Sequence, residues 1–299
     1  MPETLFGVSV TPARDVARVR ELAVTADVGG LDLIGVQDHP YAAPMLDAFA
    51  LIGHLLDHTE RIRLFPDVAN LPLRPPAMLA RTAAALNLIS GGRFELGIGA
   101  GGYWDAITTM GVPRRGPAEA LRALEEAITI IRGLWRPDHT VRFDGEHYRA
   151  SGVHGADPGP APIQVWIGAQ GPRSLELTGR VADGWAAPIP SYLPYERWKP
   201  ANDLLDRTAE EYGRAPGSIL RMAQLPGLIE TGLGATAGLR TGADPLRADA
   251  DVWVAELTRL GTEQPFDAFV FWPEEETPDQ IRRFAEEVAP RVKANLARG

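Results

Sequence analysis

The chain has 299 residues, of which 45% are hydrophobic and 23% are charged, and its formal net charge is −9. This composition supports a sizeable folded core and excludes a chain that is disordered along its whole length. The negative charge argues against a nucleic-acid partner or a membrane surface, and the absence of cysteine excludes disulfides, thiolate metal sites and cysteine nucleophiles.

Short apolar runs alternate with longer segments of helical periodicity along the chain. The start of the chain has no basic segment followed by an apolar leader, and no run is long enough to cross a membrane, so we expect a cytoplasmic protein. The predicted strands are 5–10, 31–36, 62–68, 93–99, 163–167, 184–187, 219–225 and 266–271. The predicted helices are 14–28, 45–57, 76–89, 117–135, 172–181, 195–212 and a last one from Thr277 that Pro290 kinks or divides.

Strands that alternate with helices predict right-handed crossovers and a parallel sheet. Eight such units are what a closed (β/α)8 barrel needs. We therefore predict an α/β fold in which residues 1–299 form one TIM-barrel domain. An open, doubly wound sheet is the competing architecture.

Two segments interrupt the regular pattern and are predicted as insertions after strands 4 and 7. The first, residues 136–162, contains Phe143–Tyr148, which indicates a small hairpin. The second, residues 226–249, is rich in glycine and threonine. We expect this second segment to be a long loop that covers one mouth of the barrel as a lid.

The active site of a parallel barrel lies at the carboxyl ends of its strands. The residues that follow the predicted strands are rich in glycines, amides and aromatic rings, and poor in clustered carboxylates and histidines. This favours a site in which a cofactor supplies the difficult chemistry and the protein orients it. Tyr103, Trp104 and Trp272 are candidates for the wall of a substrate site, or for ordinary packing at the barrel end.

The segment Gly97–Gly102 matches the G-x-G-x-x-G pattern of dinucleotide-binding turns. That fingerprint also needs an immediate helix and an acidic residue after the next strand, whereas Pro113 and Pro117 delay the predicted helix here. We therefore favour a different interpretation, in which Gly99, Ala100 and Gly101 form a smooth backbone that a flat ring or a phosphate can approach.

A second turn of small residues leads directly into the helix at 172–181. Helix N-termini offer free N–H groups and a favourable dipole to anions, so this turn is a candidate phosphate site. An ordinary strand-to-helix turn is an equally good interpretation on physical grounds. The candidate residues are Gly168, Ala169, Gln170, Gly171, Pro172 and Arg173.

His39 follows the second predicted strand, between Asp38 and Pro40. At this place we favour a histidine that donates a proton or a hydrogen bond over a partly exposed turn histidine.

His54 and His58 have the i, i+4 spacing of a metal chelate, but no third ligand accompanies them. We therefore expect no metal site.

Several segments together resemble the bacterial luciferase-like flavin-dependent oxidoreductases, including their deazaflavin (coenzyme F420) branch. The resemblance covers most of residues 5–190 in the right order, whereas the last third is similar only in layout. The stretches Ile89–Gly101 and Ala182–Trp185 are specific to that family. The other matching segments are Gly35–His39, Leu73–Pro76, Ala83–Leu88, Gly133–Trp135, Phe143–Gly145, Pro162–Ile163 and Gly171–Ser174.

The resemblance implies a (β/α)8 barrel, usually a homodimer, that holds FMN or coenzyme F420 at the carboxyl ends of its strands. By this analogy Asp67 and Val68, followed by Ala69, lie where a non-prolyl cis peptide backs the ring. His39, beside Asp38, lies where several deazaflavin members place a catalytic or ring-contacting histidine. The two glycine turns match segments that hold the cofactor.

The implied activity is hydride transfer between the cofactor and a small organic substrate. A monooxygenase type and an F420-dependent dehydrogenase or reductase without oxygen chemistry both stay open, as does a non-catalytic flavin-binding protein. Two departures matter here. Ala100 stands where luciferases carry an arginine for the FMN phosphate, and Gly102 stands where the sugar-phosphate dehydrogenases carry a catalytic glutamate.

Overall fold

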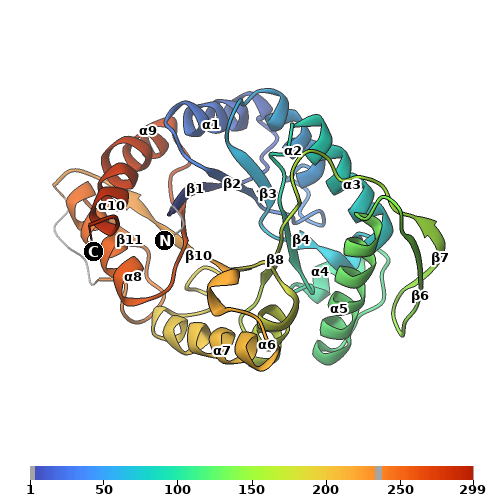
Figure 1. The fold of residues 1–299 in the computed structure, drawn as a ribbon. Helices are drawn as coiled ribbons and strands as arrows, with labels where there is room; N and C mark the ends of the chain where they lie inside the picture. Colours follow the sequence, from blue (N-terminus) through green and yellow to red (C-terminus); the bar gives the residue numbers. More distant parts are fainter. Residues whose placement is uncertain (1–3, 233–237, 299) are drawn as a thin grey trace.

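Parallel strands form a central ring with helices around it (Figure 1). The computed structural model describes residues 4–232 and 238–298, and within them eight strands make the ring. In ring order they are β3 (Arg63–Pro66), β2 (Leu33–Val36), β1 (Leu5–Val10), β12 (Ala268–Pro273), β10 (Leu220–Ile229), β9 (Gly184–Ala186), β8 (Val165–Gly168) and β5 (Leu96–Gly99). The short strand β4 (Ala69–Asn70) pairs with β5.

The ring is nearly closed between β3 and β5. The backbone N–H of Leu64 donates to the carbonyl of Arg93 at 2.9 Å, and the N–H of Glu95 donates to the carbonyl of Leu64 at 3.0 Å. These bonds form a parallel bridge between Leu64 and Phe94. The predicted TIM barrel is confirmed, and the open doubly wound sheet is wrong.

A helix follows each strand of the ring and packs its apolar face on the sheet. The helices are α1 (Val16–Val28), α2 (Ala48–Asp57), α3 (Pro76–Ile89), α5 (Pro117–Leu134), α6 (Pro172–Val181), α7 (Trp198–Glu211) after the turn η2 (Tyr195–Arg197), α8 (Ala250–Glu263) and α9 (Pro278–Arg282). Asp15, Asp47, Asp249 and Thr277 cap four of them with their side chains. None of the described helices is long and apolar enough to span a bilayer.

The last helix is interrupted, as Pro290 predicts. A π-helical segment, η4 (Arg283–Val288), joins α9 to α10 (Ala289–Leu296). Proline has no N–H to donate and its ring clashes with the preceding turn, so the regular hydrogen-bond ladder cannot run through this point.

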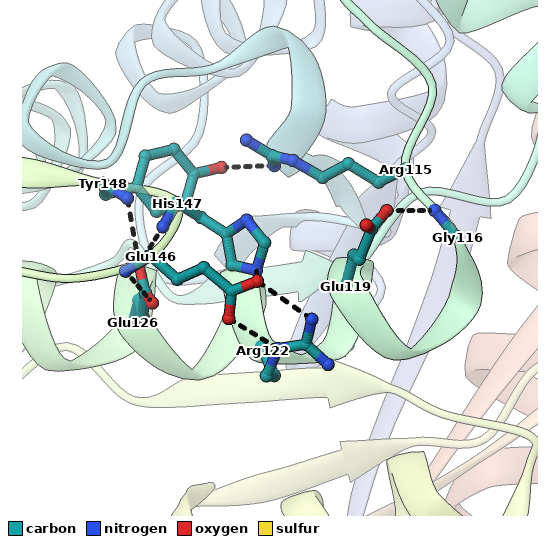
Figure 2. Close-up of polar contacts among 8 residues, drawn as sticks. All are labelled: Arg115, Gly116, Glu119, Arg122, Glu126, Glu146, His147 and Tyr148. Carbon is teal, nitrogen blue, oxygen red and sulfur yellow. Dashed lines mark hydrogen bonds and ion pairs between the residues drawn. The ribbon is translucent and has the colours of Figure 1, made fainter.

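The hairpin expected within residues 136–162 consists of β6 (Thr140–Asp144) and β7 (Arg149–His154), which pair antiparallel. Its turn lies on α5, as Figure 2 shows. The carboxylate of Glu126 accepts hydrogen bonds from the backbone N–H groups of Glu146, His147 and Tyr148 at 2.8, 2.9 and 2.9 Å. This single side chain therefore satisfies three consecutive donors of the turn.

The prediction of a structureless loop at 226–249 is wrong at both ends. Strand β10 continues to Ile229, and β11 (Leu246–Ala248) pairs with it in parallel. Gly227 permits this pairing, because a Cβ there would lie 2.2 Å from the carbonyl oxygen of Leu246. Residues 233–237 lie outside the described residues, and with them the middle of the expected lid.

Candidate functional site

The carboxyl end of the barrel interior is lined by small and polar residues. Alternate side chains of a barrel strand face inward. Inside the barrel an apolar layer is formed by Leu33, Phe65, Trp166, Met222 and Val270. Two residues further along the same strands, and at the matching places on β1 and β5, the sequence changes character. The residues at these positions are Ser9, Gly35, Asp67, Gly99, Gly168, Gln224 and Trp272.

Val68 lies against two of these glycines. A Cβ at Gly99 would approach Cγ2 of Val68 to 2.9 Å, and one at Gly168 would approach the same atom to 3.0 Å. The peptide bond between Asp67 and Val68 is cis, as the family resemblance implied. The fold thus brings Asp67, Val68, Gly99 and Gly168 together, although three separate strands supply them.

Asp67 is buried, and none of the described residues places a cation beside it. Its Oδ1 accepts a hydrogen bond from Nε2 of Gln224 at 2.9 Å, while Oδ2 is buried without a partner. Burial raises the pKa of this carboxyl to about 7. The hydrogen bond from Gln224 lowers the pKa and so offsets this rise only in part. Near neutral pH the side chain therefore lies close to its midpoint between acid and carboxylate.

Four buried polar atoms at this end have no partner among the described residues. They are Oγ of Ser9, Oδ2 of Asp67, Oδ1 of Asn70 and Nε1 of Trp272. Buried polar groups are normally hydrogen-bonded, so a group of unpaired ones next to a glycine-lined backbone fits a planar ligand with a polar edge. The residues present are therefore compatible with a flavin-like ring.

Asp38 holds the loops at the mouth together. Its carboxylate accepts Nη2 of Arg74 at 2.6 Å and Nε of Arg74 at 2.8 Å, and also the backbone N–H of Asn70 at 2.8 Å. The Asp38 side chain is fully buried, and Arg74 also bonds Asp47 at 2.8 Å. The carboxylate is thus committed to protein donors, and it fixes the position of the neighbouring His39.

His39 belongs to a group of rings from three loops at the mouth. Its Nδ1 lies 2.7 Å from the hydroxyl of Tyr41, and its ring meets the ring of Tyr103 edge-on with centroids 5.7 Å apart. Tyr103, from the loop after β5, is hydrogen-bonded to Tyr192, from the loop after β9. Burial lowers the pKa of His39, although Asp38 opposes this, so the imidazole is neutral at pH 7.

The two predicted cofactor turns differ in their detail. Gly101 has a φ of +96°, and the short helix α4 (Trp104–Thr109) begins soon after it, earlier than the sequence predicted. In the other turn Gly171 caps α6, and its N–H is 3.1 Å from Oγ of Ser174. Gln170, Pro172 and Arg173 are exposed, whereas Ala169 is buried and its carbonyl accepts Nε1 of Trp185 at 2.9 Å.

The remaining candidates lie elsewhere or have a structural partner. The ring of His54, on α2, lies 4.3 Å from the ring of His58, the C-cap residue of that helix, away from the barrel mouth. In the described part of the chain no group of three histidine or acidic side chains is placed to hold a metal ion. A dinucleotide-binding fold at Gly97–Gly102 is wrong, since these residues belong to a barrel strand and its loop.

Sequence reasoning missed several residues that the fold brings to this end. Ser9 and Gln224 are buried polar side chains with apolar neighbours on both sides in their strands, and that contrast was a usable signal. Tyr41 could have been found from the segment His39–Ala42, because Pro40 favours a turn that returns Tyr41 to the histidine. Nothing in the sequence pairs Arg74 with Asp38, which lies 36 residues away.

Comparison with known proteins gives a consistent result. A family model described as luciferase-like monooxygenase matches residues 3–230. A 5,10-methylenetetrahydromethanopterin reductase from Archaeoglobus fulgidus is 34% identical over 182 residues, which are 60% of this chain and 51% of the relative. An F420-dependent glucose-6-phosphate dehydrogenase from Amycolatopsis mediterranei is 33% identical over 173 residues, 55% of this chain and 51% of the relative. The chain spans about half the length of these curated relatives.

Solved structures extend the similarity of fold to almost the whole chain. A coenzyme F420-dependent tetrahydromethanopterin reductase from Methanopyrus kandleri superposes with a TM-score of 0.80 at 18% identity, covering 97% of this chain and 99% of that one. A long-chain alkane monooxygenase gives a TM-score of 0.80 at 14% identity, covering 98% and 92%. At these identities the likeness establishes the barrel fold alone.

Proposed function

The chain belongs to the luciferase-like monooxygenase family, and from this premise we propose that it is a flavin- or deazaflavin-dependent oxidoreductase acting on a small organic substrate. The observation that carries the proposal is the layer of glycines and unpaired buried polar atoms at the barrel mouth. A cofactor bound there would supply the hydride donor or acceptor that the side chains of this site lack.

The residues of the chain have separate tasks in this proposal. Asp67, Val68 and Ala69, with Gly99–Gly101, would face the ring, because they surround the glycine-lined backbone. The first-turn N–H groups of α6, after Gly168–Gly171, have no intrahelical acceptor and would bind a phosphate beside Arg173. His39 would hydrogen-bond or protonate the substrate close to the ring, and Asp38 would hold His39 in place.

We propose coenzyme F420 ahead of FMN as the cofactor. The names of the glucose-6-phosphate dehydrogenase relatives state that they are F420-dependent, and Ala100 removes the arginine expected for an FMN phosphate. FMN with oxygen chemistry is the second candidate, and the fold it shares with an alkane monooxygenase keeps that candidate open.

Titration of the purified protein with each cofactor, followed by fluorescence, tests this choice. Tight binding of F420 and weak binding of FMN is the expected result, and the reverse would select FMN. Gly168→Ala is the test variant, because its Cβ would press on Cγ2 of Val68 at 3.0 Å and require Val68 to shift, whereas a Cβ at Gly102 has open space around it. We expect Gly168→Ala to lose cofactor affinity and Gly102→Ala to keep it. If neither F420 nor FMN binds the parent protein, the proposal is overturned.

His39 is the side chain on which turnover should depend. We expect His39→Ala to lower kcat by about 10²-fold or more while cofactor affinity stays within a few-fold, as for a lost acid–base group. Steady-state kinetics with a panel of small alcohols, aldehydes and ketones would measure this. Tight cofactor binding without turnover of any compound would favour the non-catalytic flavin-binding alternative.

We also propose that the chain works in the cytoplasm and self-associates. Helix α3 supports self-association, because Met78, Leu88 and Ile89 on it are 62%, 63% and 77% exposed. Apolar side chains that gather on one exposed helix face are typical of surfaces that pair with another chain.

A further inference from the structure

The hydroxyl of Tyr41 and the imidazole of His39 form a hydrogen-bonded pair within one tight turn. The backbone N–H of Ala42 donates to the carbonyl of His39 at 2.8 Å, and Pro40 occupies the second position of this turn. The turn places the Tyr41 hydroxyl 2.7 Å from Nδ1 of His39, with the two ring centroids 5.6 Å apart. The local sequence thus pre-forms the contact.

Both partners are neutral around pH 7. Burial, followed by the proximity of Tyr103 and Asp38, raises the pKa of Tyr41 to about 12, so its phenol keeps the proton. Burial lowers the pKa of His39, so its imidazole carries one proton on one of two nitrogens. A phenol is the stronger acid and an imine-type nitrogen the stronger acceptor, which favours O–H···Nδ1 over the reverse bond.

The charged and titratable groups that face the pair leave this assignment intact. Asp38 precedes the turn, but both of its oxygens are already bonded to Arg74. From the loop after β5, Tyr103 presents a ring edge to His39 and uses its hydroxyl to bond Tyr192. None of these residues has a polar contact with a His39 ring nitrogen.

We propose that Tyr41 is a positioning residue. Its hydroxyl group donates a hydrogen bond to Nδ1 of His39 and thereby keeps the proton of the His39 imidazole on Nε2. The nitrogen that His39 presents to a substrate is then a hydrogen-bond donor. This suits a substrate with an acceptor lone pair at the reacting centre, such as a carbonyl or an imine. The substrate class rests on the proposed function, whereas the tautomer does not.

Nitrogen NMR of the ligand-free protein tests the tautomer without any cofactor or turnover. With ¹⁵N-labelled histidines, and His39→Gln to assign the signals, we expect Nε2 to be the protonated nitrogen of His39 and Nδ1 the unprotonated, hydrogen-bonded one. In Tyr41→Phe the Nδ1 signal should move toward that of an imine nitrogen without a donor. Tyr103→Phe is the matched control, because it keeps a ring against His39 and removes a hydroxyl that does not touch it.

Each result decides one part of the inference. A His39 whose proton sits on Nδ1, or Nδ1 signals that are the same in Tyr41→Phe and the parent protein, would overturn the tautomer assignment. With a turned-over carbonyl substrate, Tyr41→Phe should lower kcat by about tenfold or more and leave cofactor affinity unchanged, as expected for a mispositioned group. Equal kcat in the two proteins would overturn the positioning role. If neither the parent protein nor Tyr41→Phe turns over a substrate, while the NMR result is as expected, only the proposed function is overturned.

Discussion

Asp67 gives the site a titratable group whose effect on stability can be measured. Its pKa is raised from 3.8 to about 7 by burial, so between these values the folded protein holds a proton that the unfolded chain has lost. Stability should therefore fall as pH rises from about 4 to 7, by up to about 4 kcal/mol in total, and stay level above that range. In Asp67→Asn, which resembles the neutral acid, this contribution should vanish.

Chemical unfolding at pH 4, 6 and 8 measures this effect as the difference between the parent protein and Asp67→Asn. The comparison with the variant is needed because burial also raises the pKa of Glu95 to about 7. Glu95 therefore adds a pH dependence of its own to the stability of both proteins. Asp67→Asn should be close to the parent at pH 4 and more stable at pH 8. Two unfolding free energies that change in parallel across this range would show that Asp67 is ionised in the folded protein well below pH 7.

At this scale the sequence predicts which residues the fold brings to the barrel mouth better than which atoms meet there. The glycines at 99 and 168 and the residues Asp67 and Val68 could be predicted, because they follow strands and resemble family segments. The partner of Asp67 could not, since Gln224 is 157 residues away in the chain. Its approach to Asp67 depends on the register of the whole barrel.

The β6–β7 hairpin provides a prediction for a single element. Glu126 bonds three N–H groups of the hairpin turn, so Glu126→Ala should destabilise the protein by about 1.5–3 kcal/mol, the usual worth of hydrogen bonds to a charged group. Glu119→Ala is the matched control on the same helix. Glu119 accepts one hydrogen bond within the described part of the chain, from the N–H of Gly116 at 2.7 Å, and its loss should cost about 1 kcal/mol or less, in the range of a helix cap.

Denaturant unfolding, combined with amide hydrogen exchange, separates these two variants. The amides of residues 146–148 should exchange faster in Glu126→Ala only, since their acceptor is removed there. Equal losses of stability, or unchanged exchange at the turn, would mean that the hairpin is held by its other contacts. Among those are the bonds of Arg122 to Glu146 and of Arg115 to Tyr148, both visible in Figure 2.

Long periodic elements were predictable, whereas two short elements, β11 and α4, were missed. Helices α3 and α6 begin and end where the sequence places them, and a proline in the first turn marks the start of both. Strand β11 has three residues and α4 has six, too few for a period to show. The glycines and threonines of 226–249 indicated a loop, and the pairing of β11 depends on contact with β10 rather than on local sequence.

The whole barrel is fixed by its alternation of strands and helices, which is why its closure could be predicted before any contact was known. What the alternation does not determine is which outer face would pair with another chain. The helices that follow the ring strands present one face to the sheet, but α3 also carries exposed apolar residues, at 62% for Met78 and 77% for Ile89. These two residues lie eleven positions apart, close to three helical turns, and so share one side of α3.

Self-association through this side is the prediction at the scale of the molecule. We expect the parent protein to be dimeric at micromolar concentration and the double variant Met78→Asp with Ile89→Asp to be monomeric, because two buried charges facing their copies cannot be paired. Tyr212→Asp is the control, since Tyr212 is 60% exposed at the end of α7, well away from α3 around the ring in Figure 1. Sedimentation velocity measures all three proteins. A monomeric parent, or a double variant that stays dimeric while its far-ultraviolet spectrum is unchanged, would show that α3 does not form the interface.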